Sequence, residues 1–240
     1  MNAAILVAAG KGVRMSAGLR QADGASAPQA GVDKLFLEVA GRPVVAHTWQ
    51  RFNDAQCISE IVVVVRDGMQ REFEKLAATY HLQKPFLIVA GGAERQDSVW
   101  NGLEALPVTA EIVAIQDAAR PCTSVELIAT TIQAAEETGA AVAAQPVTDT
   151  IKESEDGRLI ERTLDRSKLW AVQTPQSFRV EVIRRALAEV RRRHLVFTDD
   201  TAACELIGQQ IRLVSSISPN PKVTVPGDLP FIETLLRHKS

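Results

Sequence analysis

Cysteine is scarce in this chain, and long apolar runs are absent. Three cysteines, Cys57, Cys122 and Cys204, occur among 240 residues, and their odd number and wide spacing argue against a disulfide framework. No apolar run reaches the roughly 18 residues of a membrane-spanning helix. A strand-like run that starts at Ala3 leaves no room for a signal peptide before it. These absences predict a soluble, cytoplasmic protein without a membrane partner.

An excess of charge of either sign is also lacking. The chain has 27 basic and 29 acidic side chains, for a net charge of −2, and this balance does not support a nucleic-acid or membrane-surface partner. Its four histidines are scattered, without the spacing of metal ligands. We therefore expect no nucleic-acid partner and no metal site built from protein side chains. Any cationic site must be local.

The first stretch of the chain indicates a phosphate site. Residues 3–8 form a short apolar run that is typical of a strand buried on both faces of a sheet. Glycines follow at Gly10 and Gly12, and a glycine turn frees main-chain N–H groups for a ligand. Arg14 lies in the same turn, and Lys34 follows a longer loop. A strand that opens into a glycine turn with positive charge favours phosphate binding, and a structural turn with surface cations remains the alternative.

Two common phosphate motifs do not match this turn. The dinucleotide fingerprint requires a third glycine, where this chain has Met15. A P-loop requires Ser or Thr directly after its lysine, and here Gly12 follows Lys11. The predicted phosphate site is therefore of another kind.

Patterns along the rest of the chain alternate between strand and helix. Residues 16–32 have no periodicity and predict a mobile surface loop. Thr174-Pro175-Gln176 predicts a stop for the strand before it, and Thr198-Asp199-Asp200 predicts the start of a helix that runs to 207. Strands are predicted over 61–65, 86–90, 112–116, 140–145 and 211–214, and helices over 43–53, 69–80, 123–138, 179–194 and from 228.

Two further turns follow predicted strands. Gly91-Gly92 begins a turn that ends at Ser98, and Asp117 and Arg120 bracket two alanines after the strand over 112–116. A plain strand-to-helix connection and a salt-bridged turn, respectively, are the alternatives. In an open α/β sheet, ligands bind outside the carboxyl ends of the strands. Three such turns in one chain therefore favour a single ligand site.

The segment 146–166 has a different character. Residues 147–153 and 158–163 look like two strands around a turn at Asp156-Gly157. They are too charged for a core, and an isolated two-stranded hairpin is barely stable. We therefore predict that this segment is a β-arm that reaches over a partner subunit.

With these motifs in view, the chain resembles the 2-C-methyl-D-erythritol 4-phosphate cytidylyltransferase family over essentially its whole length. Each motif alone is weak, and their order and spacing together carry the resemblance. The resemblance implies a doubly wound, mostly parallel α/β sheet of Rossmann-like nucleotidyltransferase fold, in one domain over 1–240, with a β-arm that builds a homodimer. The motifs are Ala8–Met15, Gly91–Ser98, Asp117–Pro121, Val147–Lys152, Asp165-Arg166, Gln173–Gln176, Thr198–Asp200 and Lys222–Thr224.

The resemblance also implies an activity. Members transfer CMP from CTP to 2-C-methyl-D-erythritol 4-phosphate and release pyrophosphate, with Mg²⁺ bound through the CTP phosphates. Two alternatives remain: a cytidylyltransferase for another polyol phosphate, such as ribitol 5-phosphate, and a non-catalytic nucleotide-binding module. The chain departs from the family at Leu35 and Gln116, where glutamine and histidine are common, at Ala93, and in a longer loop before Lys34.

Roles for individual residues follow from the same resemblance. Arg14 and Lys34 match the transition-state cations, and Arg166 is expected to complete the site of the partner subunit. The acceptor is assigned to Arg166, Lys222, Thr148, Asp149 and Thr198, and the nucleotide to Ala8, Ala9, Gly10, Gly12, Gly92, Arg95, Ser98, Asp117, Ala118 and Arg120.

Overall fold

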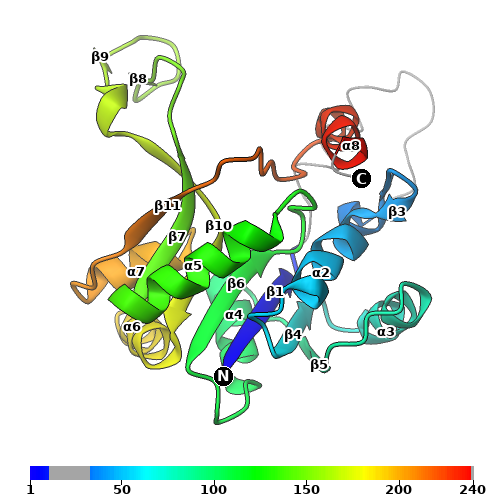
Figure 1. Cartoon of the computed structure of the whole chain (residues 1–240). Helices are drawn as coiled ribbons and strands as arrows, with labels where there is room; N and C mark the ends of the chain where they lie inside the picture. The colour runs from blue at the N-terminus through cyan, green and yellow to red at the C-terminus, as the bar shows by residue number, and fades with distance from the viewer. Residues whose placement is uncertain (11–32, 239–240) are drawn as a thin grey trace.

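A seven-stranded sheet forms the centre of the molecule (Figure 1). The computed structural model describes residues 1–10 and 33–238, so the loop predicted over 16–32 lies outside it. Its strands are β1 (Asn2–Ala8), β4 (Glu60–Val65), β5 (Phe86–Ala90), β6 (Ile112–Asp117), β7 (Ala140–Pro146), β10 (Trp170–Arg179) and β11 (Arg212–Ser215). They lie in the order β11-β7-β10-β6-β1-β4-β5. Only β10 runs antiparallel to its neighbours in this sheet, which confirms the mostly parallel α/β fold.

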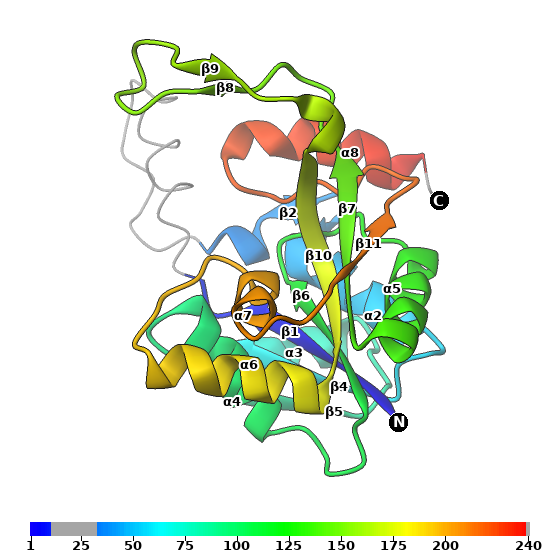
Figure 2. The same ribbon diagram turned by 90° about the vertical axis from the view of Figure 1, so that its left-hand side faces the viewer.

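Helices cover both faces of the sheet (Figure 2). Ala4 and Leu6 of β1 point into one apolar cluster, and Ala3 and Ile5 into the other, because successive side chains of a strand face opposite sides. One face is covered by α2 (Val44–Asp54), α3 (Gln70–Thr79), α5 (Val125–Thr138) and α8 (Leu229–Arg237), the other by α4 (Arg95–Glu104), α6 (Val180–Arg192) and α7 (Asp200–Leu206). Within the described part of the chain, every helix is too short or too polar to span a bilayer.

The predicted arm projects from the body between the end of β7 and the start of β10 (Figures 1 and 2). Its strands are shorter than predicted, because only β8 (Lys152–Glu153) and β9 (Arg162–Thr163) pair. Asp156 Oδ1 accepts hydrogen bonds from the amides of Arg158 and Leu159. In the segment that connects β8 and β9, local turns therefore take the place of further pairing between the two strands. A charged hairpin without a face packed on a core gains little from a longer ladder.

Two other predictions need correction. The strand was expected to stop at Thr174-Pro175-Gln176, yet β10 continues through them to Arg179. Its register with β7 shifts between Val172 and Gln176, and the Thr174–Pro175 peptide is cis. Proline lacks the N–H that a ladder needs, and a bulge is where a strand tolerates it.

The second correction concerns Pro43. It was predicted to open α2, and it instead pairs in a short hairpin of β2 (Glu38–Val39) and β3 (Arg42–Pro43) that the sequence did not predict. Three short 3₁₀ turns complete the chain: η1 (Lys34–Phe36), η2 (Arg166–Lys168) and η3 (Pro226–Asp228).

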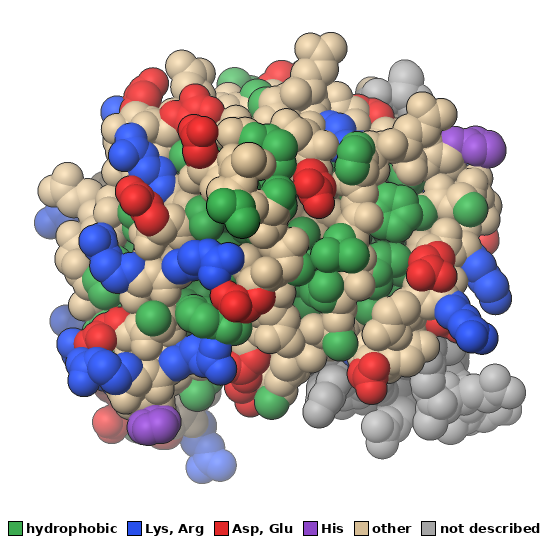
Figure 3. All heavy atoms as spheres, turned by 90° about the horizontal axis from the view of Figure 1, so that it is seen from below, with side chains coloured by type: hydrophobic (Ala, Val, Ile, Leu, Met, Phe, Trp, Pro, Cys, Tyr) green, Lys and Arg blue, Asp and Glu red, His purple; other side chains and the backbone are tan. Residues whose placement is uncertain are grey.

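Charge is mixed on the surface at the amino ends of the parallel strands. Figure 3 shows basic and acidic side chains interspersed among apolar ones over this face. The ion pair of Arg184 with Glu104 joins α6 to α4, and Arg191 of α6 stacks on Trp100 of α4, 4.6 Å from the ring centroid. The arginines of α6 thus contact neighbouring side chains rather than forming a uniform cationic surface.

Candidate functional site

A cavity of about 420 Å³ opens at the carboxyl ends of β1, β5 and β6. Its walls come from the three turns that follow these strands, together with two lysines that lie far away in the sequence. Many of the residues expected to bind a ligand line it: Ala8, Ala9, Gly10, Lys34, Gly92, Arg95, Ser98, Asp117, Ala118 and Lys222. Leu35, one of the departures from the family pattern, is also a lining residue and is buried.

The glycine turn after β5 packs directly on the turn after β1. A Cβ atom added to Gly91 would lie 2.4 Å from Cβ of Ala9, and one added to Gly92 would lie 2.3 Å from Cβ of Asp97. The amide of Gly92 donates to Oγ of Ser98 at 3.1 Å, and that hydroxyl donates to the carbonyl of Glu94 at 3.2 Å. Ser98 therefore also shapes the turn, and only glycine permits this close approach.

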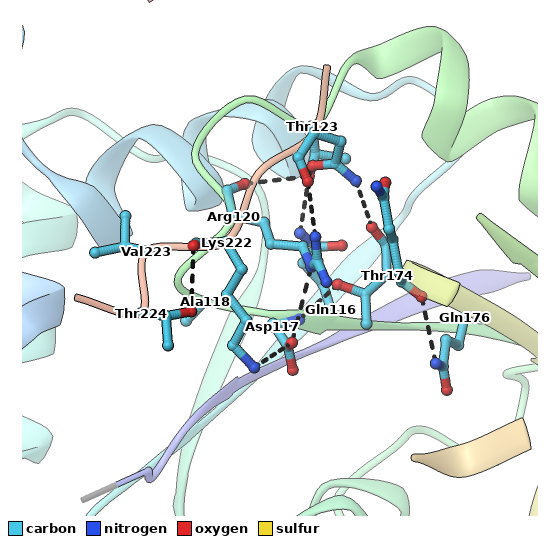
Figure 4. Close-up of polar contacts among 12 residues, drawn as sticks. Gln116, Asp117, Ala118, Arg120, Thr123, Thr174, Gln176, Lys222, Val223 and Thr224 are labelled. Carbon is cyan, nitrogen blue, oxygen red and sulfur yellow. Dashed lines mark hydrogen bonds and ion pairs between the residues drawn. The ribbon is translucent and has the colours of Figure 1, made fainter. Parts of the chain in front are cut away.

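Asp117, the last residue of β6, is the centre of the charges at the cavity. Its carboxylate accepts from Nζ of Lys222 at 2.7 Å and lies 3.5 Å from Nε of Arg95 and 3.8 Å from Nε of Arg120. Figure 4 shows the contact with Lys222. Burial opposes ionisation of this carboxyl group, but Lys222, Arg95 and Arg120 outweigh it and hold the pKa of Asp117 at about 2. The group is therefore an anion throughout the physiological pH range.

Arg95 is clamped between two carboxylates. Its Nη1 donates to Oδ2 of Asp200 at 2.7 Å, and Asp200 is only 1% exposed. Burial disfavours the charge of Arg95, yet Asp200 and Asp117 more than compensate and raise its pKa. Burial raises the pKa of Asp200, and Arg95 opposes that rise. This ion pair fixes the start of α4 against the start of α7.

Asp200 is a residue whose role the sequence did not reveal. Its neighbour Asp199 is the N-cap of α7, since its carboxylate accepts from the amide of Ala202 at 2.9 Å, as the sequence predicted for this turn. The pattern indicates acidic residues at a helix start. The sequence pattern carries no signal that Asp200 forms an ion pair with Arg95, which lies 105 positions earlier in the chain.

The two lysines of the cavity are held by one C-terminal segment. Nζ of Lys34 donates to the carbonyl of Val223 at 2.8 Å, next to Lys222. The amide of Val223 donates to the carbonyl of Ala119 at 2.8 Å, which fastens the segment to the turn after β6. Asp33 caps the turn that carries Lys34 and accepts from Nη2 of Arg66 at 2.6 Å. The fold thus holds Lys222 against Asp117 and Lys34 against Val223, so both lysines line the cavity before any ligand binds.

A buried polar network supports the turn after β6 from behind (Figure 4). Nε2 of Gln116 donates to Oγ1 of Thr123 at 2.9 Å, and Thr123 bonds Oδ1 of Asn220 at 2.9 Å. Nη1 of Arg120 donates to the carbonyl of Asn220 at 2.7 Å, and Nδ2 of Asn220 to the carbonyl of Thr174 at 2.8 Å. Arg120, predicted to bind the nucleotide, therefore lies in this network and does not line the cavity.

Gln116 fills the position where the family commonly has histidine. It is fully buried, and its Oε1 accepts no hydrogen bond from any described residue. Its side-chain amide nitrogen, Nε2, donates to Thr123 in the network, and Gln116 does not line the cavity. Gln116 therefore supports the shape of the turn after β6.

The residues predicted to bind the acceptor lie in different places in the structure. Lys222 lines the cavity, whereas Arg166, Thr148, Asp149 and Thr198 do not. Nη1 of Arg166 donates to the carbonyl of Thr148 at 2.7 Å, at the base of the arm. Two further predicted residues, Gly12 and Arg14, lie outside the described residues. Among residues 1–10 and 33–238, no three His, Cys, Asp or Glu side chains are grouped closely enough to hold a metal ion.

Comparisons with known proteins give a consistent result. Residues 2–238 match the profile of the 2-C-methyl-D-erythritol 4-phosphate cytidylyltransferases. Proteins of that name from Geobacillus kaustophilus and Bacillus velezensis are 40% and 38% identical, over 97% and 98% of this chain and 96% of each relative.

Solved structures agree with the sequence relatives. A 4-diphosphocytidyl-2C-methyl-D-erythritol synthase from Anaerococcus prevotii has a TM-score of 0.81 at 27% identity, covering 99% of this chain and 96% of that one. The 2-C-methyl-D-erythritol 4-phosphate cytidylyltransferase from Thermus thermophilus has a TM-score of 0.77 at 31% identity, covering 99% and 100%. Sequence, sheet order and the charged cavity thus lead to one conclusion: this chain belongs to the 2-C-methyl-D-erythritol 4-phosphate cytidylyltransferase family.

Proposed function

We propose that this protein transfers the CMP group of CTP to 2-C-methyl-D-erythritol 4-phosphate, which yields 4-diphosphocytidyl-2-C-methyl-D-erythritol and pyrophosphate. The observation that carries the proposal is the match over residues 2–238 to enzymes of this name. The cavity at the carboxyl edge of the sheet supports it, because it combines small residues, backbone donors and two lysines.

The transfer needs positioning and charge more than a reactive side chain. An oxygen of the acceptor phosphate attacks the α-phosphorus of CTP, the bond from that phosphorus to the bridging oxygen breaks, and pyrophosphate leaves with the electron pair. Negative charge grows on the phosphoryl oxygens, where cations stabilise it. Lys34, which lines the cavity, is proposed to take this role, and Arg14 is proposed to share it. The acceptor is already an anion, so no nucleophilic residue is required.

The nucleotide is proposed to lie against the three turns. The missing side chains at Gly10 and Gly92 let the phosphates and the base approach the main chain closely, and the ionised carboxylate of Asp117 suits a ribose hydroxyl. Lys222, which lines the cavity and contacts Asp117, is proposed to bind the acceptor phosphate. A pyrimidine fits the small residues of the lining better than a purine does.

Magnesium is proposed to bind through the phosphates of CTP. The carboxylate of Asp117 is surrounded by cations, so it is a poor ligand for a second positive ion. Mg²⁺ readily takes most of its oxygen ligands from substrate phosphates and water. When bound there, it would neutralise part of the charge on the triphosphate.

A homodimer is proposed because the arm offers apolar side chains to solvent in the single chain. Leu159 and Ile160 are 74% and 65% exposed, and Trp170 and Val172 at the root of β10 are also exposed. Exposed apolar clusters of this kind mark interaction surfaces. Arg166 stands at the base of the arm and away from its own cavity, which fits a role in the site of the partner subunit.

A cytoplasmic location is proposed because Cys57, Cys122 and Cys204, all within the described residues, form no disulfide. Burial raises the pKa of the Cys204 thiol to about 12, which keeps that thiol protonated. A chain whose cysteines form no disulfide suits a reducing compartment.

One assay tests the proposed reaction. Pyrophosphate release is measured with CTP and Mg²⁺ against a panel of acceptors that includes 2-C-methyl-D-erythritol 4-phosphate and ribitol 5-phosphate. We expect the first acceptor to have the highest kcat/KM, and CTP to be preferred strongly over ATP and GTP. A higher kcat/KM for ribitol 5-phosphate would assign the protein to the other polyol, and no turnover with any acceptor would favour a binding module.

A further inference from the structure

A second cavity, of about 590 Å³, shares no lining residue with the catalytic cavity. It lies where the β2–β3 turn, α2 and the end of α8 meet, on one side of the molecule (Figure 1). Four of its lining residues are basic: Arg42, His47, Arg51 and Arg237. None of the described lining residues is acidic. In a chain with a net charge of −2, this is a local concentration of positive charge.

The basic side chains come from three separate elements and have different partners. Arg42 stacks on the ring of Tyr80, 5.5 Å from its centroid, and Nη2 of Arg237 pairs with Glu233 at 2.7 Å. Arg51 makes no side-chain hydrogen bond or ion pair with any described residue. Arg42 and Arg51 therefore both keep guanidinium N–H groups for a ligand, whereas Arg237 donates to Glu233.

His47 reports the electrostatics of this cavity. Its Nε2 lies 2.7 Å from the carbonyl of Val39, to which the ring donates. Burial lowers the pKa of His47, and the nearby charges of Arg42 and Arg51 lower it further. The guanidinium groups of Arg42 and Arg51 are thus close enough to His47 to disfavour a charge on its ring, and an anion bound between them would offset that effect.

Each arginine alone has an ordinary structural explanation. Arg51 lies in the last turn of α2, where a cation favours the helix dipole, and Arg237 forms an i,i+4 pair on α8. Neither explanation accounts for basic groups from three elements around one hollow. Guanidinium groups bind phosphate oxygens with strong, paired hydrogen bonds.

We propose that this second cavity, bounded by Arg42, His47, Arg51 and Arg237, binds a small phosphate-bearing molecule, with a diphosphate group as the chemistry that it fits best. Several fixed cations around one cavity favour an anion with more than one charge. The cavity volume of about 590 Å³ admits such a group together with a small substituent. The site goes beyond the proposed transferase reaction and does not depend on it.

The test uses His47 as a reporter, because pyrophosphate is also expected to enter the catalytic cavity. Proton NMR of the four histidine rings of the whole protein follows a titration with inorganic pyrophosphate in magnesium-free buffer. We expect a saturable shift of the His47 resonances and a rise in the pKa of His47, since a bound anion stabilises the imidazolium. The exposed His81 serves as an internal reference.

Two matched variants separate binding from bulk charge. Arg51→Gln should weaken the Kd read at His47 by about tenfold or more, the loss expected for one hydrogen bond to a charged group. Arg71→Gln removes the same charge from an exposed position on α3 and should leave the Kd unchanged. Thermal melting of both variants checks that each is folded.

Four outcomes would overturn the proposal. His47 could show no shift at millimolar pyrophosphate, or the same shift with sodium chloride at equal ionic strength. Arg71→Gln could weaken binding as much as Arg51→Gln does. A lower Tm of Arg51→Gln with an unchanged Kd would assign Arg51 to the helix end alone.

Discussion

Lys34 is the one proposed transition-state cation that lies among the described residues, where it lines the cavity. Lys34→Ala should lower kcat by roughly 10²–10³-fold, the usual loss for one donor to a developing charge, with a smaller change in KM for CTP. Steady-state kinetics of pyrophosphate release measure both. Lys75→Ala, at an exposed position on α3, is the control. A near-normal kcat for Lys34→Ala would remove it from the mechanism.

Asp117 links the charges of the site to the stability of the fold. Its pKa of about 2 in the folded protein lies below the ordinary value of 3.8. The unfolded chain therefore binds the proton more readily at acidic pH, and stability falls as the pH is lowered through this range. The lowered pKa of Asp117 adds roughly 2 kcal/mol to the free energy of unfolding, and this stabilisation is fully present above about pH 4.

Asp117→Asn tests this linkage. The free energy of unfolding of wild type should exceed that of the variant most at pH 5, and the difference should shrink toward pH 3 as Asp117 of the unfolded wild-type chain takes up a proton that the folded protein does not yet bind. Urea titrations at several pH values give the difference directly. If the gap between the two proteins stayed constant across this range, the ion pairs of Asp117 would not be what stabilises the turn.

Elements with a strong local pattern could be predicted from the sequence. The β-branched run over 61–65 and the apolar run over 86–90 are strands within one residue of prediction, because short apolar runs rich in β-branched or aromatic residues favour a strand. The β2–β3 hairpin was missed, since two-residue strands have no period to detect. The stop at Pro175 was wrong because a bulge accommodates the proline, and a bulge depends on the partner strand.

Contacts between distant elements lay beyond the sequence pattern. Ion pairs from Lys222 to Asp117 and from Arg95 to Asp200 each join residues 105 positions apart. Three turns rich in glycine or charge indicated where the site would be. Only the order of strands in the sheet decides which side chains meet there, so the resemblance to a family supplied the residue roles and the fold supplied the pairings.

The turn after β5 is the element whose shape the site most requires. Gly92→Ala would place Cβ 2.3 Å from Cβ of Asp97, at the start of α4. We expect it to lower the free energy of unfolding by about 1–3 kcal/mol, the usual cost of overpacking, and to raise KM for CTP. Gly227→Ala meets no atom within 4 Å and should be nearly neutral. Equal stabilities of the two variants by urea titration would contradict the close packing of this turn.

At the scale of the whole molecule, the arm raises the question of which subunit Arg166 serves. If it completes the partner's site, Lys34→Ala and Arg166→Ala proteins, mixed and re-assembled, should complement each other. Random pairing makes about half of the dimers mixed, each with one intact site of two, so activity should return to roughly a quarter of wild type. Subunit exchange is verified with differently tagged chains. Exchange without recovered activity would place Arg166 in the site of its own chain.

Strand β10 joins two environments within ten residues. Trp170 to Val172 are exposed at the root of the arm, whereas Thr174 to Phe178 are buried between β6 and β7. Because opening of the arm does not require the core to open, amide hydrogen exchange should divide this one strand into a fast and a slow half. Dilution that separates the subunits of the proposed homodimer should accelerate exchange only in the first half. The hydroxyl oxygen of Thr174, which accepts from the amide of Asp117, lies at the boundary between the two halves of β10. The site therefore begins where protection from hydrogen exchange begins.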